Sequence, residues 1–195
     1  MDAKARSDVA RLSDVARRRT TAGVRPERTH TVVDSPLGPL TLVNSGGILS
    51  GLYMDGQHHR PDRSRFGRQT PSGFEQAVDE LDEYFSGHRR TFSVPVRPTG
   101  SDFERSVWRL LTDIPYGHTR TYGELAAAVD GDDADWTLAR AVGAAIGHNP
   151  IGVIVPCHRV IGSDGSLTGY AGGLERKAFL LALENPPPVA QQTLF

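Results

Sequence analysis

Between residues 29 and 98, the hydrophobic positions come in short runs that are separated by glycine and proline. Such runs are typical of strands joined by tight turns, and they predict an antiparallel meander. The polar, arginine-rich stretch 55–70 is expected to be a surface loop. The apolar runs are 31–33, 40–43 and 48–54, and the predicted turns are Ser35-Pro-Leu-Gly-Pro39 and Ser45-Gly-Gly47.

A helix is predicted after this loop, because apolar residues then recur at the spacing of one helical face. Ser72 and Glu75 have the spacing of a capping box at its start, and Gly87 marks its end. Beyond the helix, every second residue is apolar, which predicts one further strand. The helical face consists of Phe74, Val78, Leu81 and Phe85, and the strand residues are Phe92, Val94 and Val96.

The second half of the chain has a helical pattern. Two further capping boxes, Ser101 with Glu104 and Thr121 with Glu124, predict the starts of two helices on either side of the turn at Pro115-Tyr-Gly117. A third helix is predicted from about Trp136 to Ile146, ending at Gly147. Two short helices joined by a loop, the second carrying mostly small side chains, favour a helix-turn-helix.

These patterns predict an α/β N-terminal domain, an antiparallel sheet with a helix, followed by a mainly helical C-terminal domain. We expect domains at 29–98 and 99–185, a basic flexible arm at 1–28 and a flexible tail at 186–195. The arm is expected to be a solvated tail, with a nonspecific phosphate-binding arm as the alternative.

The composition is that of a globular protein: 195 residues, 38% of them hydrophobic, with a net charge of −1. A neutral molecule does not attract polyanions as a whole, so any contact with nucleic acid must come from a local patch. No long apolar segment is present, and we expect a cytoplasmic protein without membrane contact. The single cysteine, Cys157, excludes an internal disulfide and a multi-thiolate zinc site.

Candidate chemistry lies in Ile154-Val-Pro-Cys-His-Arg-Val-Ile161, which places this cysteine directly before histidine and arginine. Nearby positive charge or a base raises the thiolate fraction of a cysteine. A lone cysteine is nevertheless more often a small buried hydrophobe. Similarly, Leu138 to Ala145 carries one large polar side chain, Arg140, among very small ones. That pattern fits close helix packing as well as DNA contact.

Two motifs carry a family resemblance. Pro156-Cys-His-Arg-Val160 and Gly169-Tyr-Ala-Gly-Gly173 resemble the active-site signature of the O6-alkylguanine-DNA alkyltransferases, also called methylated-DNA–protein-cysteine methyltransferases. The similarity extends from Ser35 to Glu184. It implies a ribonuclease H-like N-terminal domain and a winged-helix-like C-terminal domain with a helix-turn-helix.

The resemblance implies a role for each matching residue. Cys157 would take the alkyl group from O6 of guanine, His158 would act through a water as its base, Glu184 would hold the histidine and Asn149 would brace the turn. The alkylated nucleotide would leave the base stack, and Arg140 would fill its place. The implied substrate-binding residues are Tyr122, Val160, Tyr170 and Ala171, and the implied DNA-binding residues besides Arg140 are Ala139, Ala141 and Gly143.

The implied reaction is direct repair of double-stranded DNA containing O6-alkylguanine. A thioether product has no good leaving group, so each molecule should act only once. We also expect a monomer, and we expect no cofactor and no metal. Whether O4-alkylthymine is also accepted stays open. One alternative is a noncatalytic protein that binds alkylated DNA and flags lesions, although such relatives replace the cysteine. Another alternative is a cysteine hydrolase, but that function would not explain the helix of small residues that carries Arg140.

Two segments extend or depart from the resemblance. The acidic stretch Gly131 to Asp135 lengthens the connection before Arg140. It would either repel phosphate or shift the recognition helix, and either effect would concern DNA affinity more than the chemistry. The C-terminal end, Gln191 to Phe195, resembles short peptides that dock on the bacterial replication sliding clamp, with Leu194 and Phe195 as apolar anchors. The alternative for this end is a frayed terminus.

Overall fold

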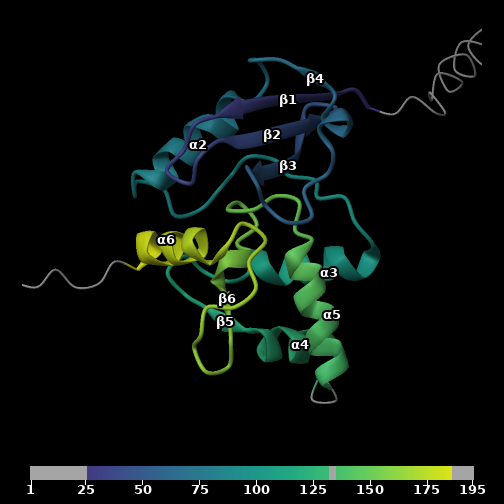
Figure 1. The fold of residues 1–195 in the computed structure, drawn as a ribbon, viewed down its shortest axis with the longest axis vertical. Helices are drawn as coiled ribbons and strands as arrows, with labels where there is room; N and C mark the ends of the chain where they lie inside the picture. Colours follow the sequence, from purple (N-terminus) through teal and green to yellow (C-terminus); the bar gives the residue numbers. More distant parts are fainter. Residues whose placement is uncertain (1–25, 132–134, 186–195) are drawn as a thin grey trace, which may run out of the picture.

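The computed structural model describes residues 26–131 and 135–185 (Figure 1). The N-terminal half is a sheet with the strand order β3-β2-β1-β4 and one long helix. Strands β1, β2 and β3 form the predicted antiparallel meander, whereas β4 runs parallel to β1 and makes the sheet mixed. The elements are β1 (Arg28–Val33), β2 (Leu40–Ser45), β3 (Ile48–Met54), β4 (Arg68–Gln69) and α2 (Glu75–Phe85).

The glycine turns that connect the meander require backbone conformations that other residues rarely adopt. Gly46 and Gly47 form the two-residue link between β2 and β3, with φ angles of +61° and +80°. Two consecutive positive φ angles are characteristic of tight hairpin turns, and glycine adopts them without steric cost. The expected loop 55–70 also contains a short 3-10 helix, η1 (Arg63–Phe66), in addition to β4.

Two local predictions in this half are wrong. The predicted capping box at Ser72 does not form, because the chain turns at Gly73 and α2 begins only at Glu75. The Glu75 carboxylate instead accepts a hydrogen bond from the Gly73 amide.

The predicted strand at 92–96 is also absent, apart from a single bridge between Leu49 and Val96. The buried Glu80 carboxylate accepts the amides of Ser93 and Val94, at 2.8 and 3.1 Å, so these amides are not available to a strand.

The C-terminal half is helical, as predicted. The capping boxes at Ser101 and Thr121 both form, and α5 ends at the predicted glycine. Helices α4 and α5 pack as a helix-turn-helix at the end of the molecule opposite the sheet (Figure 1). The elements are α3 (Asp102–Thr112), β5 (Arg120–Thr121), α4 (Tyr122–Asp130), α5 (Trp136–Gly147), η3 (Cys157–Arg159), β6 (Val160–Ile161) and α6 (Leu174–Glu184).

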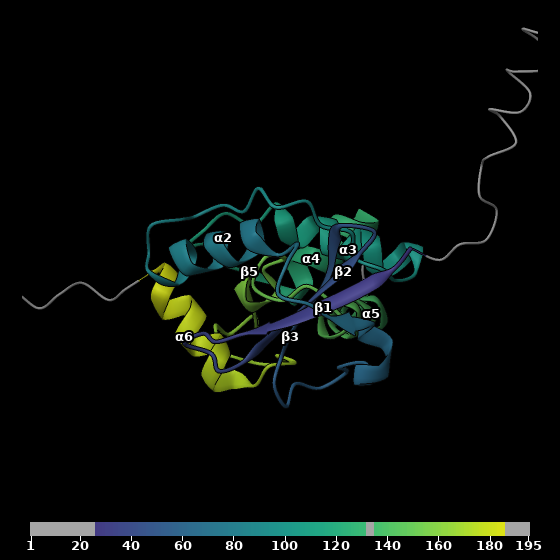
Figure 2. The same cartoon turned by 90° about the horizontal axis from the view of Figure 1, so that it is seen from above.

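The two halves share one hydrophobic core, which runs from the sheet through α2 to α3, α4 and α5. Strand β3 contributes directly to this junction, because the amide of Leu52 donates to the carbonyl of Pro150 at 2.8 Å and Leu52 forms a parallel bridge with Ile151. Seen from above, α2 lies along one side of the strands and α6 across their end (Figure 2). The segment leading to Cys157 is therefore anchored to the N-terminal sheet.

Three sequence interpretations fall outside the described residues. They concern most of the basic arm, the acidic residues 132–134 and the C-terminal segment with its clamp-like end at Gln191 to Phe195. No helix in the part of the chain that the structure describes is long and apolar enough to cross a membrane.

Candidate active site

Asn149 organises the turn that delivers Cys157. Its side-chain oxygen accepts the amide of Ile151 at 3.1 Å, and its Nδ2 donates to the carbonyl of Val155 at 2.8 Å. Within this turn Val153 has a φ of +69°, a strained conformation for a β-branched residue. The buried Asn149 thus provides the hydrogen bonds that hold an otherwise unfavourable backbone.

Cys157 begins η3 and is only 6% exposed. Burial raises the pKa of its thiol, and the hydrogen bond from Asn149 Nδ2 to Sγ, at 3.1 Å, opposes this effect only in part. The thiol is therefore protonated at neutral pH. Nucleophilic chemistry at this sulfur requires a base and access for the substrate.

His158 follows directly and is completely buried. Its Nε2 lies 2.8 Å from Oε1 of Glu184, whereas Nδ1 has no hydrogen-bond partner among the described residues. Burial lowers the pKa of His158 more than the neighbouring carboxylate raises it. The imidazole is thus neutral, with Nε2–H donating to Glu184 and the lone pair of Nδ1 free to accept a proton.

Glu184, at the end of α6, is the centre of a dense hydrogen-bond network. Burial alone would raise its pKa, but the hydrogen bonds from His158 and Arg159 outweigh burial and lower the pKa to about 2. The carboxylate is therefore charged at neutral pH. Besides His158, its donors are the hydroxyl of Tyr84 at 2.7 Å, Nε and NH2 of Arg159 at 2.9 Å each, and the amide of Gly117 at 3.1 Å.

The sequence alone assigned no role in the site to Tyr84, Arg159 or Gly117. Arg159 could have been identified as a candidate site residue, because it lies two positions after Cys157 in the cysteine motif. Tyr84 belongs to α2 of the N-terminal half, one hundred residues before Glu184. No local pattern links the two residues, and only the fold brings the end of α2 to the end of α6.

The proposed substrate-binding residues surround the same region. The Tyr122 hydroxyl, on the first residue of α4, lies 3.1 and 2.9 Å from the carbonyls of Thr168 and Gly169. The buried Lys177 donates to the carbonyls of Val160 and Thr168, at 2.5 and 2.6 Å, and its Nζ lies 5.9 Å from the centre of the Tyr122 ring. Burial lowers the pKa of Lys177 to about 8.

The remaining residues of this group lie in the loop before α6. The Ala171 carbonyl accepts the amide of His58 at 2.9 Å, which connects the loop to the N-terminal half. The hydroxyl of Tyr170 is buried and forms no hydrogen bond within the described residues. Burial, reinforced by the neighbouring Cys157, raises the pKa of Tyr170, so its phenol stays protonated.

Helix α5 carries the proposed DNA-binding residues. Arg140 is exposed and lies with its guanidinium 5.6 Å from the centre of the Trp136 ring. Ala141 is exposed, whereas Ala139 and Gly143 are half-buried. Gly143 lies beside Tyr122, because a Cβ at this position would be 3.8 Å from the tyrosine ring. The helix thus presents Arg140 on the outside and packs against Tyr122 on the inside.

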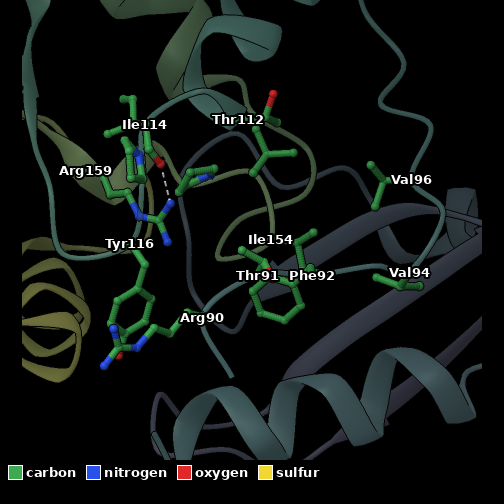
Figure 3. Close-up of a pocket in the computed structure, with 13 residues that line it drawn as sticks. Arg90, Thr91, Phe92, Val94, Val96, Thr112, Ile114, Tyr116, Ile154 and Arg159 are labelled. Carbon is green, nitrogen blue, oxygen red and sulfur yellow. Dashed lines mark hydrogen bonds between the residues drawn. The ribbon is translucent and has the colours of Figure 1, made fainter. Parts of the chain in front are cut away.

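A cavity of about 330 Å³ is lined in part by Arg159, one of the donors to Glu184 (Figure 3). Arg159, Tyr116 and Arg90 lie on one side of the cavity and Val94 and Val96 on the other. Arg159 donates to the carbonyl of Ile114 at 2.6 Å, and both arginines stack on the Tyr116 ring. Cys157, His158 and Glu184 are not among the residues that line this cavity. Among the described residues, no group of three histidine, cysteine or carboxylate side chains is placed to hold a metal ion.

Two family models match the chain and define its class. Residues 29–98 match the ribonuclease-like domain of 6-O-methylguanine DNA methyltransferase, and residues 102–186 match the DNA-binding domain of the same protein. The chain belongs to the 6-O-methylguanine DNA methyltransferase family. The resemblance derived from the cysteine motif is thereby confirmed, as is the expected fold class.

Similar proteins from bacteria and archaea support this assignment. The methylated-DNA–protein-cysteine methyltransferase of Mycobacterium tuberculosis (strain H37Rv) is 48% identical over 166 residues, which cover 85% of this chain and 98% of that protein. The protein of the same name from Methanosarcina barkeri is 44% identical, over 80% of this chain and 96% of its own length. A crystal structure of Mycobacterium tuberculosis OGT in complex with DNA matches with a TM-score of 0.73 and 48% identity, covering 80% of this chain and 92% of that one.

Proposed function

We propose that the protein repairs alkylated DNA by transferring the alkyl group from O6 of guanine to Sγ of Cys157. In this reaction the carbon–oxygen bond of the lesion breaks and a carbon–sulfur bond forms. The thiol proton passes to His158, and the leaving guanine is protonated as negative charge develops on it. Relatives that are 48% identical carry the name methylated-DNA–protein-cysteine methyltransferase, which supports this chemistry.

The observation that carries the proposal is the buried array of a neutral thiol, a neutral imidazole and a charged carboxylate. Nδ1 of His158 is free to accept the proton of Cys157, directly or through a water. The imidazolium that results is stabilised by Glu184, 2.8 Å from Nε2. Asn149 donates to Sγ at 3.1 Å and stabilises the developing thiolate.

We propose that Tyr122 relays a proton to the leaving guanine. The proton that His158 takes from the thiol then returns to the tyrosinate through solvent, so that the net transfer is from Cys157 to guanine. The Tyr122 hydroxyl lies within hydrogen-bond distance of the Thr168 and Gly169 carbonyls. A phenol has one proton to donate, so guanine must take the place of these carbonyls as acceptor. The backbone at Val160 and Ala171, together with Tyr170, is proposed to surround the guanine edge.

The burial of Cys157 requires the damaged nucleotide to leave the duplex. We propose that α5 lies in the minor groove, with Arg140 filling the space that the nucleotide vacates. The DNA complex of the Mycobacterium tuberculosis relative supports DNA as the partner. A local contact of this kind is compatible with a net charge of −1.

The number of turnovers tests this function against its alternatives. Incubation with an excess of duplex containing O6-methylguanine should restore one guanine per protein molecule and then stop, because the thioether cannot be displaced. A noncatalytic binder would restore none, and a hydrolase would continue to react. Either result would contradict the proposal.

We also propose that the protein is a monomer that acts in the cytoplasm without a cofactor. A separate hypothesis is that Gln191 to Phe195 docks on the replication sliding clamp. The clamp hypothesis rests on sequence alone, because this segment lies outside the described residues. Retention on immobilised clamp should be lost when residues 191–195 are deleted. Equal retention of the full-length and shortened chains would end the hypothesis.

A further inference from the structure

Trp136 is the most exposed of the large hydrophobic side chains in the part of the chain that the structure describes. It lies in the first turn of α5 and is 69% exposed, whereas Trp108, the other tryptophan, is 2% exposed and packed in the core. Tryptophan offers a large apolar surface that is usually buried in a protein or in an interface. Its exposure beside Arg140 makes it a candidate contact residue on the outer face of α5.

The neighbours of Trp136 on α5 indicate the chemistry of a partner. Arg140 follows one helical turn later, and its guanidinium lies 5.6 Å from the centre of the indole ring. The rest of the exposed surface of this helix is formed by small side chains such as Thr137, Ala141 and Ala144. An indole beside a guanidinium is a combination that stacks on bases and sugars while a positive charge faces phosphate.

We propose that Trp136 contacts DNA directly and stacks on a sugar or base of the strand next to the position of Arg140. This inference rests on the proposed function, which makes α5 the helix that faces DNA. Trp136 is then a second anchor on the same helical face. It strengthens DNA binding and takes no part in the transfer of the alkyl group.

Intrinsic fluorescence tests this contact, because the difference between the wild type and the Trp136→Phe variant isolates the emission of Trp136. Addition of an undamaged duplex should change this emission and protect it from quenching by acrylamide. An emission and a quenching constant that are unaffected by saturating DNA would overturn the proposal.

Affinity measurements add a second readout. Trp136→Ala should weaken duplex binding on the order of tenfold, the effect of losing one aromatic stacking contact. Trp136→Phe retains a ring and should bind within about threefold of the wild type. Phe179→Ala, which removes a 40% exposed ring from α6, is the matched control and should bind like the wild type. Wild-type affinity of Trp136→Ala, with unchanged circular dichroism, would also overturn the proposal.

The stoichiometry of alkyl transfer separates this inference from the proposed function. At saturating duplex, Trp136→Ala should still accept one alkyl group per molecule, because only affinity is lost. If the wild type transfers nothing but DNA still protects Trp136, the proposed function fails and the DNA contact stands. If the wild type repairs DNA while Trp136 is unaffected by it, this inference alone fails.

Discussion

The reactivity of Cys157 depends on its neighbours, because burial keeps its own proton in place. The pKa of the thiol is raised, whereas the pKa of His158 is lowered below its usual 6.5. A thiolate is therefore not formed in advance, and the proton must move to Nδ1 of His158 as the substrate reacts. Glu184 makes this transfer favourable by stabilising the imidazolium through Nε2.

The pH dependence of the transfer rate follows from these shifts. His158 must be neutral to accept the proton, so its titration should leave the rate unchanged above pH 6.5 and lower the rate at more acidic pH. Single-turnover rates measured with saturating damaged duplex between pH 5 and 8.5 check this expectation. A rate that rises tenfold per pH unit up to pH 8.5 would instead indicate simple ionisation of an exposed thiol.

The pH dependence of the free energy of unfolding should also be set by Glu184 and His158. The folded-state pKa of Glu184 is about 2, below the ordinary 4.5, and that of His158 is also lowered. A lowered pKa means that the unfolded chain binds the proton more tightly, so acid favours unfolding. The contribution of His158 is present above pH 6.5 and that of Glu184 above pH 4.5. Each is lost as the pH falls towards the folded-state value.

Urea unfolding at pH 7.5, 5.5 and 3.5 measures this effect. The free energy of unfolding should be highest at pH 7.5 and lowest at pH 3.5. A protein that becomes more stable between pH 7.5 and 5.5 would contradict the assignment of a neutral, buried His158.

At the level of elements, the helix caps both stabilise the fold and position the site. Thr121 caps α4 directly before Tyr122, and Ser101 caps α3 by the same reciprocal hydrogen bonds away from the substrate. Removing either hydroxyl should lower the free energy of unfolding by about 1 kcal/mol. Only Thr121→Ala should also slow the transfer, since it loosens the turn that carries the proposed proton donor.

Chemical denaturation together with single-turnover kinetics separates the two effects, and Ser101→Ala is the matched control. Equal transfer rates in the two variants would show that the start of α4 is not important for Tyr122.

The sequence predicted those elements whose signals are local. The caps at Ser101 and Thr121 are confirmed by the structure. They were predictable because each cap residue and its glutamate partner are close in sequence. The strand at 92–96 was predicted wrongly because Glu80, on another element, takes its amides. Similarly, the family resemblance marked Cys157 and Glu184, whereas Tyr84 could not be found without knowing how α2 packs.

For the whole molecule, the hydrogen bond from Tyr84 to Glu184 connects the N-terminal half to the proposed catalytic residues. Oε1 of Glu184 accepts hydrogen bonds from both Tyr84 and His158, at 2.7 and 2.8 Å. The sheet and α2 therefore do more than support the helical half. They help to fix the carboxylate that orients the proposed base.

Tyr84→Phe tests this connection, because it removes the hydroxyl and keeps the ring in the core. The variant should lose about 1.5–3 kcal/mol of stability, the usual effect of a hydrogen bond to a charged group. It should also slow the transfer and change the pH below which the transfer rate falls, because the charge on Glu184 acts directly on His158. Tyr116→Phe is the control, because the Tyr116 hydroxyl bonds to the backbone carbonyl of Leu183. If both variants have wild-type rates and pH profiles, Tyr84 has only a packing role.

The most direct measurement is the mass of the intact protein after incubation with a duplex that contains O6-methylguanine, followed by peptide mapping. We expect the mass to increase by one methylene, located on the peptide with Cys157, and the Cys157→Ser variant to show no increase. Modification of another residue, or repair by Cys157→Ser at the wild-type rate, would contradict the central claim.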